Sequence, residues 1–133
     1  MFVHRLRVRF HECDPQGVVF NAHYFSYFDV ALTEMWRAAF GSYAKVVEDG
    51  TDVVVVEAGA TFRAPARFDD EVDVELVIER LGTTSMTMAA AVRRDGRLLV
   101  EGRLVHVFVD PATMAKKEIP PDVRAGLEPY AAI

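Results

Sequence analysis

The residue with the clearest chemical potential is Asp14, a carboxylate in the segment CDPQG (13–17) just ahead of a predicted helix. Pro15 and Gly17 mark this segment as a turn or loop. The first amides of a helix have no partners inside it and carry partial positive charge, so the amides of residues 21–24 suit a developing oxyanion. A carboxylate folded back beside them could attack a carbonyl or activate water. The alternative is structural, because an acidic residue near a helix start also favours the helix dipole.

Two other reactive side chains are weaker candidates for this chemistry. Glu34 lies in the middle of the predicted helix and is a reserve carboxylate, although a structural polar contact explains it as well. Cys13 adjoins Asp14 and could act as a nucleophile beside His11 or His23. A free cysteine, however, is more often a small buried apolar residue.

The sequence lacks the common metal and cofactor motifs. Its four histidines show neither HxxxH nor HxxH spacing, and Cys13 is the single cysteine, so we expect no metal site. It contains no GxGxxG, no GxxxxGK[ST] and no GxSxG, which argues against dinucleotide binding, a P-loop and a nucleophile elbow. We therefore expect no dissociable cofactor.

One long helix must position these residues, and it follows a strand. Residues 2–12 alternate between apolar and polar side chains, with Phe2 and Phe10 on the apolar side, which predicts a strand with one buried face. Residues 21–41 change to a helical period, with Asn21 as the expected N-cap and Gly41 as the stop. This helix is apolar over most of its circumference, so other elements must wrap it.

The rest of the chain supplies that wrapping. We expect a short helix over 42–50, strands over 51–65, 69–81, 83–96 and 97–110, and a Pro-broken tail with one or two helical turns over 111–133. Gly59 predicts a bulge, and the pair Asp95-Gly96 predicts a tight hairpin. The pattern indicates one α+β domain over residues 1–133, with an antiparallel sheet of about five strands around the helix. Its strand edges and apolar helix predict self-association of at least two chains.

Composition narrows the class of protein. The 133 residues are 51% hydrophobic and 26% charged, the balance of an ordinary folded domain. A net charge of -5 argues against a general nucleic-acid binder. The opening residues lack an apolar core of signal-peptide length, and no run is long enough for a membrane span, so we expect a cytosolic protein.

The stretch CDPQGVVFNAHYFSYFD (13–29) resembles the signature of the hotdog-fold acyl-CoA thioesterases. It is most similar to the 4-hydroxybenzoyl-CoA thioesterase branch and its Tol-Pal-associated relatives. A second block, FRAPARFDDEVDVE (62–75) followed by LGTTSMTM (81–88), also resembles that branch. The order of the elements agrees over nearly the whole chain. The matching residues of the first block are Asp14, Gly17, Val19, Asn21, Tyr24, Tyr27 and Asp29.

The resemblance implies roles for several of these residues. Asp14 takes the place of the catalytic carboxylate, as nucleophile or as general base, and the backbone amide of Asn21 polarises the thioester carbonyl. Gly17 lets the loop approach closely. Tyr24 lies near the acyl pocket, with plain core packing as an equal alternative. At Leu32 this chain departs from relatives that carry arginine, so no ion pair is expected there.

The second block implies further contacts with the substrate. Thr84 and Ser85 are expected to bind it, and the basic residues of segments 82–97 and 114–117 either meet coenzyme A phosphates or form a solvated face. The resemblance implies hydrolysis of an acyl-CoA by a homodimer or homotetramer, with the acyl group and the carrier left open. The alternatives are a hotdog dehydratase or hydratase, which needs a His–acid pair, and a noncatalytic acyl-thioester binding protein.

Overall fold

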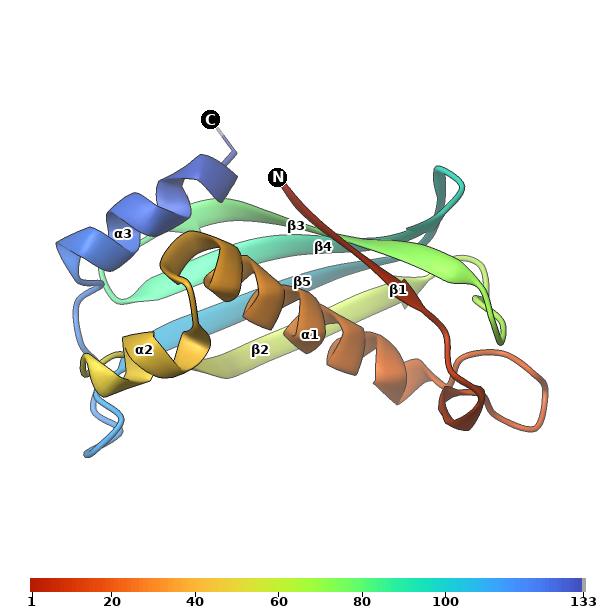
Figure 1. The fold of residues 1–133 in the computed structure, drawn as a ribbon, viewed down its shortest axis with the longest axis horizontal. Coiled ribbons are helices and arrows are strands. Elements are labelled where there is room, and N and C mark those ends of the chain that lie inside the picture. Colours follow the sequence, from red (N-terminus) through yellow and green to blue (C-terminus); the bar gives the residue numbers. More distant parts are fainter. Residues whose placement is uncertain (133) are drawn as a thin grey trace.

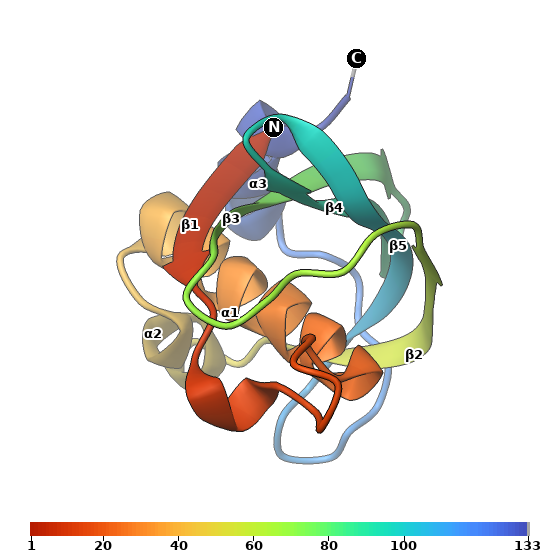
Figure 2. The ribbon, with the colours of Figure 1, turned by 90° about the vertical axis from the view of Figure 1, so that its right-hand side faces the viewer.

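A five-stranded antiparallel sheet curls around one long helix, as Figures 1 and 2 show. The computed structural model describes residues 1–132. The sheet order is β1-β3-β4-β5-β2, so β1 and β2 form its two edges. The expected α+β class is confirmed. The elements are β1 (Phe2–Arg7), η1 (Phe10–Glu12), α1 (Asn21–Phe40), α2 (Tyr43–Glu48), β2 (Asp52–Phe62), β3 (Glu71–Leu81), β4 (Ser85–Arg94), β5 (Arg97–Val109), α3 (Pro121–Leu127) and η2 (Glu128–Tyr130).

Helix α1 is the core of the molecule, lying against the concave face of the sheet (Figure 2). Phe28 and Trp36 are buried, as the helical pattern predicts. The ring of Phe28 lies so close to Gly102 on β5 that a Cβ added there would be 2.8 Å from the ring. Glycine at position 102 therefore lets the helix approach the sheet. The buried residues of α1 are Tyr24, Tyr27, Phe28, Ala31, Leu32, Met35 and Trp36.

The inner face of the sheet completes this core. On β3 the alternate residues Val72, Val74, Leu76 and Ile78 are all buried, as their period of two predicts. The β4–β5 hairpin turns at Asp95-Gly96, where φ is +50° and +81°. Two consecutive positive φ angles match the type I′ turn that suits hairpin twist, so this prediction is confirmed.

Two local expectations are wrong, the extent of the first strand and the N-cap of α1. Strand β1 ends at Arg7, the last of its residues that pairs with β3. Phe10 lies in a short 3₁₀ turn, and 78% of its surface is exposed. The N-cap of α1 is Phe20, because its N–H donates to the Glu12 carbonyl at 3.0 Å and holds it extended. Asn21 is therefore the first helical residue.

The bulge of β2 is displaced from its expected position. Gly59 pairs regularly with Arg103 on β5. The register shifts instead between Val55 and Glu57, which leaves Val56 as the extra residue. The irregularity therefore lies nearer the middle of the strand.

The two edges of the sheet differ strongly in length and charge. Strand β1 has 6 residues and carries Arg5 and Arg7, which pair with acidic residues of β3. Strand β2 has 11 residues and exposes Val55, Val56 and Phe62. Short charged edges resist pairing with another chain, whereas long apolar edges favour it. Within residues 1–132, no helix is both long and apolar enough to cross a membrane.

The core contains one polar side chain that its position does not explain. His106 on β5 is 1% exposed, and neither ring nitrogen has a hydrogen-bond partner in the described part of the chain. Burial lowers its pKa to about 4, so the imidazole is neutral at pH 7. Buried polar groups are nearly always hydrogen-bonded, which makes this residue an exception.

Truncating the helix core should be costly. We expect Phe28→Ala to lower the free energy of unfolding by about 3–5 kcal/mol, because the ring fills the space over Gly102 and leaves a cavity. Denaturant melts measure the loss. The exposed Ser26→Ala on the same helix is the matched control and should change stability by less than about 0.5 kcal/mol. Equal, small losses for both variants would contradict the central place of α1.

His106 should make stability depend on pH. Its folded pKa of about 4 lies below the ordinary value of about 6.5, so between these values only the unfolded chain binds the proton. The contribution of the neutral His106 side chain to the free energy of unfolding is thus present at pH 7. It is lost as the pH falls from about 6.5 toward 4. Between pH 7 and pH 5 the loss amounts to about 2 kcal/mol. His106→Leu should remove that part of the loss in urea melts at the two pH values, and an unchanged difference would contradict it.

Candidate active site

The loop that carries Asp14 is closed by its own backbone. The N–H of Asp14 donates to the Val18 carbonyl at 2.9 Å, and the N–H of Gly17 donates to the Asp14 carbonyl at 2.9 Å. The Asp14 carboxylate accepts from the Gln16 N–H at 2.8 Å through Oδ1. Its Oδ2 atom has no protein partner within residues 1–132. The half-buried carboxylate therefore keeps one oxygen free for another molecule.

Position 17 has a backbone conformation that favours glycine. Its φ is +79°, a left-handed conformation that other residues adopt with strain. No protein atom lies within 4 Å of a Cβ built there. The resemblance implied that Gly17 lets the loop approach closely. No protein atom crowds this position, so the feature of glycine that the protein itself uses here is the left-handed backbone conformation. Gly17 turns the chain so that Asp14 and Val18 can bond.

The start of α1 offers two free donors beside this loop. Neither the Asn21 nor the Ala22 N–H has an acceptor in the described part of the chain, whereas the His23 N–H donates to the Phe20 carbonyl at 2.9 Å. The hydrogen bond from the Phe20 N–H to the Glu12 carbonyl holds the helix start next to Glu12, which lies two residues before Asp14. Two amides with partial positive charge thus lie at the same turn as the carboxylate.

A buried ion network anchors this turn, and the sequence analysis missed it. Glu12 is 3% exposed, and its Oε1 accepts from the Arg9 N–H and the Tyr27 hydroxyl, both at 2.8 Å. Its Oε2 accepts from Arg9 Nη2 at 2.6 Å. Burial alone would raise the pKa of Glu12, but these donors outweigh burial and hold the pKa below its usual value. The alternation of residues 2–12 does place Glu12 on the same side as Phe2 and Phe10, but a carboxylate there was not singled out as buried. Its spacing to Arg9 is a further signal of the pair.

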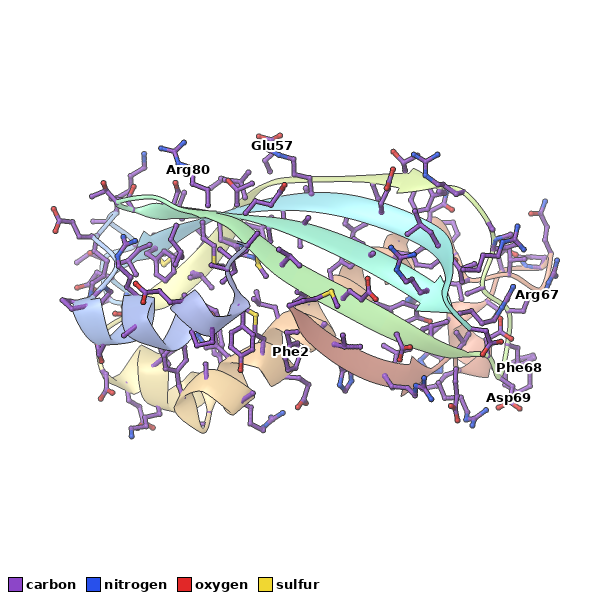
Figure 3. All side chains as sticks on the ribbon, turned by 90° about the horizontal axis from the view of Figure 1, so that it is seen from above. Phe2, Glu57, Arg67, Phe68, Asp69 and Arg80 are labelled. Carbon is purple, nitrogen blue, oxygen red and sulfur yellow. The ribbon has the colours of Figure 1, made fainter. Side chains whose placement is uncertain are left out.

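Tyr24 joins the helix to the loop of residues 63–70. Its hydroxyl accepts from the Ala66 N–H at 3.1 Å, and burial raises its pKa. It also borders a hollow of about 220 Å³ between α1 and the end of β2, together with Asn21 and Phe62. The two interpretations of Tyr24 are therefore compatible, because it is a core residue that lines a hollow at the helix start. Beyond Ala66, the same loop carries Arg67, Phe68 and Asp69, which point outward at this end of the molecule (Figure 3).

The structure does not bring Thr84 and Ser85 to this site within one chain. Both lie where β3 turns into β4, beside α3, where the Ile119 N–H donates to the Thr83 carbonyl. Strand β3 begins near the Asp14 loop and runs away from it for 11 residues, or roughly 33 Å. Only a second protomer could bring the β3–β4 turn to Asp14. The second block is therefore divided, because residues 62–70 lie beside the Asp14 loop and residues 81–88 lie at the opposite end of the sheet.

The other sequence candidates also have structural partners. Glu34 pairs with Arg37 and lies roughly 20 Å along the helix from Asn21. Cys13 is half-buried, with its Sγ 3.9 Å from the Arg9 carbonyl. The basic residues expected near coenzyme A are partly engaged within the protein. Arg93 pairs with Glu75, Arg94 pairs with Asp70, and Lys117 donates to the Gly50 carbonyl.

The remaining surface offers no rival centre in the described part of the chain. A larger hollow of about 470 Å³ lies on the outer face of the sheet, lined largely by small residues such as Gly59, Ala89 and Ala91. No group of three His, Cys, Asp or Glu side chains within residues 1–132 could hold a metal ion. The Asp14 loop and the helix start that follows it supply a carboxylate oxygen and two amides without protein partners in the described residues. Such a pair can polarise a carbonyl and attack it, directly or through water.

Comparisons with known proteins find relatives over nearly the whole chain. The acyl-CoA thioester hydrolase YbgC of Escherichia coli is 30% identical over 121 residues, covering 90% of each chain. A crystal structure of a hypothetical protein from Aquifex aeolicus is 30% identical, with a TM-score of 0.91 over 96% of this chain and 99% of that one. The gentisyl-coenzyme A thioesterase BH1999 is 26% identical, with a TM-score of 0.84 over 92% of this chain and 98% of its own.

The family model of the thioesterase-like superfamily matches residues 8–127. This range includes the Asp14 loop, helix α1 and the whole of β2 to β5. The sheet curled around one helix is the hotdog fold that the sequence resemblance implied. The chain belongs to the thioesterase-like superfamily.

Proposed function

We propose that this protein hydrolyses the thioester bond of an acyl-CoA, with Asp14 as the catalytic carboxylate. The observations that carry the proposal are an Asp14 carboxylate oxygen without a protein partner and, at the helix start that follows the same loop, the unpaired amides of Asn21 and Ala22. Membership of the superfamily and the names of YbgC and the gentisyl-coenzyme A thioesterase support the substrate class. The free acid and coenzyme A are the products.

The mechanism uses the same two groups in either of two ways. The amides of Asn21 and Ala22 hold the thioester oxygen and stabilise the negative charge that develops on it. As nucleophile, Asp14 attacks the carbonyl carbon, the C–S bond breaks to release the coenzyme A thiolate, and water then hydrolyses the mixed anhydride. As general base, Asp14 removes a proton from a water molecule that attacks the same carbon. The acyl group begins at the hollow beside Tyr24.

A dehydratase or hydratase is the alternative enzyme, and its chemistry needs a histidine paired with an acid. His106 is the buried histidine of the sheet, and it has no hydrogen-bond partner in residues 1–132. The noncatalytic alternative retains binding without thiol release. A thiol-release assay on a panel of acyl-CoA thioesters separates hydrolysis from both alternatives.

The working unit proposed here is an assembly of at least two chains that pair along β2. That edge is 11 residues long, is apolar, and exposes Val55 at 47% and Val56 at 59%. A second chain paired there would cover these side chains and satisfy the free strand edge. The cytosolic location predicted from the sequence stays a prediction.

Light scattering should detect the assembly. At micromolar concentration we expect a mass of at least twice 14.9 kDa. A lysine placed in the exposed edge by Val55→Lys should shift the protein toward monomer, because a charge opposes edge pairing. The matched change Val3→Lys on the charged edge β1, where Val3 is also exposed, should leave the mass unchanged. A stable monomer of the unaltered protein over this range would refute the assembly.

Asp14→Asn should abolish most of the activity. The substitution keeps the size of the side chain and its bond from the Gln16 N–H, but it removes the negative charge and most of the basicity. We expect turnover of the best acyl-CoA to fall by at least about 100-fold. Stopped assays of thiol release measure this, and circular dichroism checks that the loop change leaves the fold intact.

The matched control exchanges another carboxylate for an amide on the same protein. Glu34→Gln lies far along α1 and removes only a surface pair with Arg37, so its turnover should stay within a few fold of wild type. A folded Asp14→Asn protein that also retains turnover within a few fold would remove Asp14 from the mechanism.

A further inference from the structure

The loop that carries Asp14 is the tip of a small hairpin. At its base the Phe20 N–H donates to the Glu12 carbonyl at 3.0 Å, and nearer the tip the Asp14 N–H donates to the Val18 carbonyl at 2.9 Å. Phe20 is at the same time the N-cap of α1. One hairpin therefore determines both where the backbone of Asp14 lies and where the helix with its unpaired amides begins.

The first strand of this hairpin is held from the helix through the side chain of Glu12. The Tyr27 hydroxyl, from the second turn of α1, donates to Glu12 Oε1 at 2.8 Å. Arg9 adds its backbone N–H to the same oxygen and its guanidinium to Oε2. Glu12 and Tyr27 are both almost completely buried, so their hydrogen bond is shielded from water and strengthened by the charge of the carboxylate. The residue two before Asp14 is thereby tied to α1.

The return strand of the hairpin is held separately, but from the same helix. The Val19 N–H donates to the Ala66 carbonyl at 2.9 Å, and the Ala66 N–H donates to the Tyr24 hydroxyl at 3.1 Å. The rings of Tyr24 and Tyr27 pack edge to face, with their centroids 5.8 Å apart. Two neighbouring tyrosines of α1 thus hold the two strands of the hairpin, one through a buried carboxylate and one through a backbone amide.

We propose that Tyr27 and Glu12 are positioning residues, which hold the hairpin so that the Asp14 carboxylate is placed for the reaction. The proposal rests on the acyl-CoA hydrolase function and deepens it, because both residues act through Asp14. Only one residue separates Glu12 from Asp14, so little chain is available to absorb a shift of the anchor. A displacement of about 1 Å at a reacting group can lower a rate by roughly 100-fold.

Tyr27→Phe tests the proposal, because it removes the hydroxyl and keeps the ring in the core. We expect kcat for the best acyl-CoA to fall about tenfold while KM stays within about twofold, since the position of the carboxylate affects the chemical step and not the binding of substrate. A hydroxyl that only stabilises the fold would leave both constants of the folded protein unchanged. A kcat within about twofold of wild type would therefore overturn the proposal.

Tyr43→Phe is the matched control, because the Tyr43 hydroxyl also donates to a carboxylate, that of Asp52. Tyr43 begins α2, beyond the C-terminal end of α1 and roughly 30 Å along that helix from Asn21. We expect this variant to lower the melting temperature about as much as Tyr27→Phe does, but to leave kcat and KM unchanged. An equal fall of kcat in the two variants would attribute the effect to lost stability and overturn positioning.

A pair of substitutions at position 12 tests whether the hydrogen bonds of the side chain are what matters. Glu12→Gln keeps an oxygen that can accept from the Arg9 N–H and the Tyr27 hydroxyl, whereas Glu12→Ala keeps none. We expect kcat of Glu12→Gln to be at least about tenfold higher than kcat of Glu12→Ala, because the glutamine restores the anchor. Equal values of kcat for the two variants would contradict a role in holding the hairpin.

Amide hydrogen exchange separates this proposal from the hydrolase function, because it needs no substrate. In the unaltered protein we expect the N–H groups of Asp14 and Phe20 to exchange at least about 100-fold more slowly than in an unfolded chain, and Tyr27→Phe should speed both about tenfold. Unprotected amides in the unaltered protein would refute the positioning, even if no Glu12 variant could be purified. Absence of cleavage together with the expected exchange would overturn the hydrolase and still support Tyr27 and Glu12 as the residues that position Asp14.

Discussion

Burial of α1 inside a single curled sheet is the constraint on which the rest of the structure depends. The helix is apolar around most of its circumference, and the ring of Phe28 reaches β5 only because residue 102 is glycine. Once the helix lies along the concave face, its first turn must emerge at one end of the sheet. There the loop that carries Asp14 leads into the helix start, where the N–H groups of Asn21 and Ala22 have no acceptor in the described part of the chain. The site is thus a consequence of how the core is packed.

Periodic features of the sequence predict most of this fold, and local competition explains the rest. The alternation on β3 and the pair Asp95-Gly96 lead directly to the observed strand and hairpin. Asn21 is a good N-cap by type, but the backbone bond between Phe20 and Glu12 decides where the helix begins. Such a tertiary bond leaves no trace in propensity, so the boundary could not be predicted.

The candidate site could be predicted only in part, for a similar reason. Asp14 and Gly17 lie in a short contiguous motif, which the sequence shows directly. Thr84 and Ser85 were joined to them through a second block, although the direction of β3 places residues 81–88 of that block at the opposite end of the sheet. The unpaired state of His106 is invisible in sequence, because a histidine in an alternating strand is usually assumed to find a partner. Whether the His106 side chain is buried and hydrogen-bonded depends on the folded structure and not on its neighbours in the sequence.

The anchor of the loop by Glu12 has a consequence for how this site can be inherited or transplanted. Both carboxylate oxygens of Glu12 are saturated by groups of Arg9 and Tyr27, which lie on either side of the Asp14 loop in the sequence. Replacing any one of the three residues leaves a charge or a donor without its partner, so we expect Arg9, Glu12 and Tyr27 to change together. A protein engineer who moves the Asp14 loop to another scaffold must therefore carry the side chain from the second turn of the helix with it.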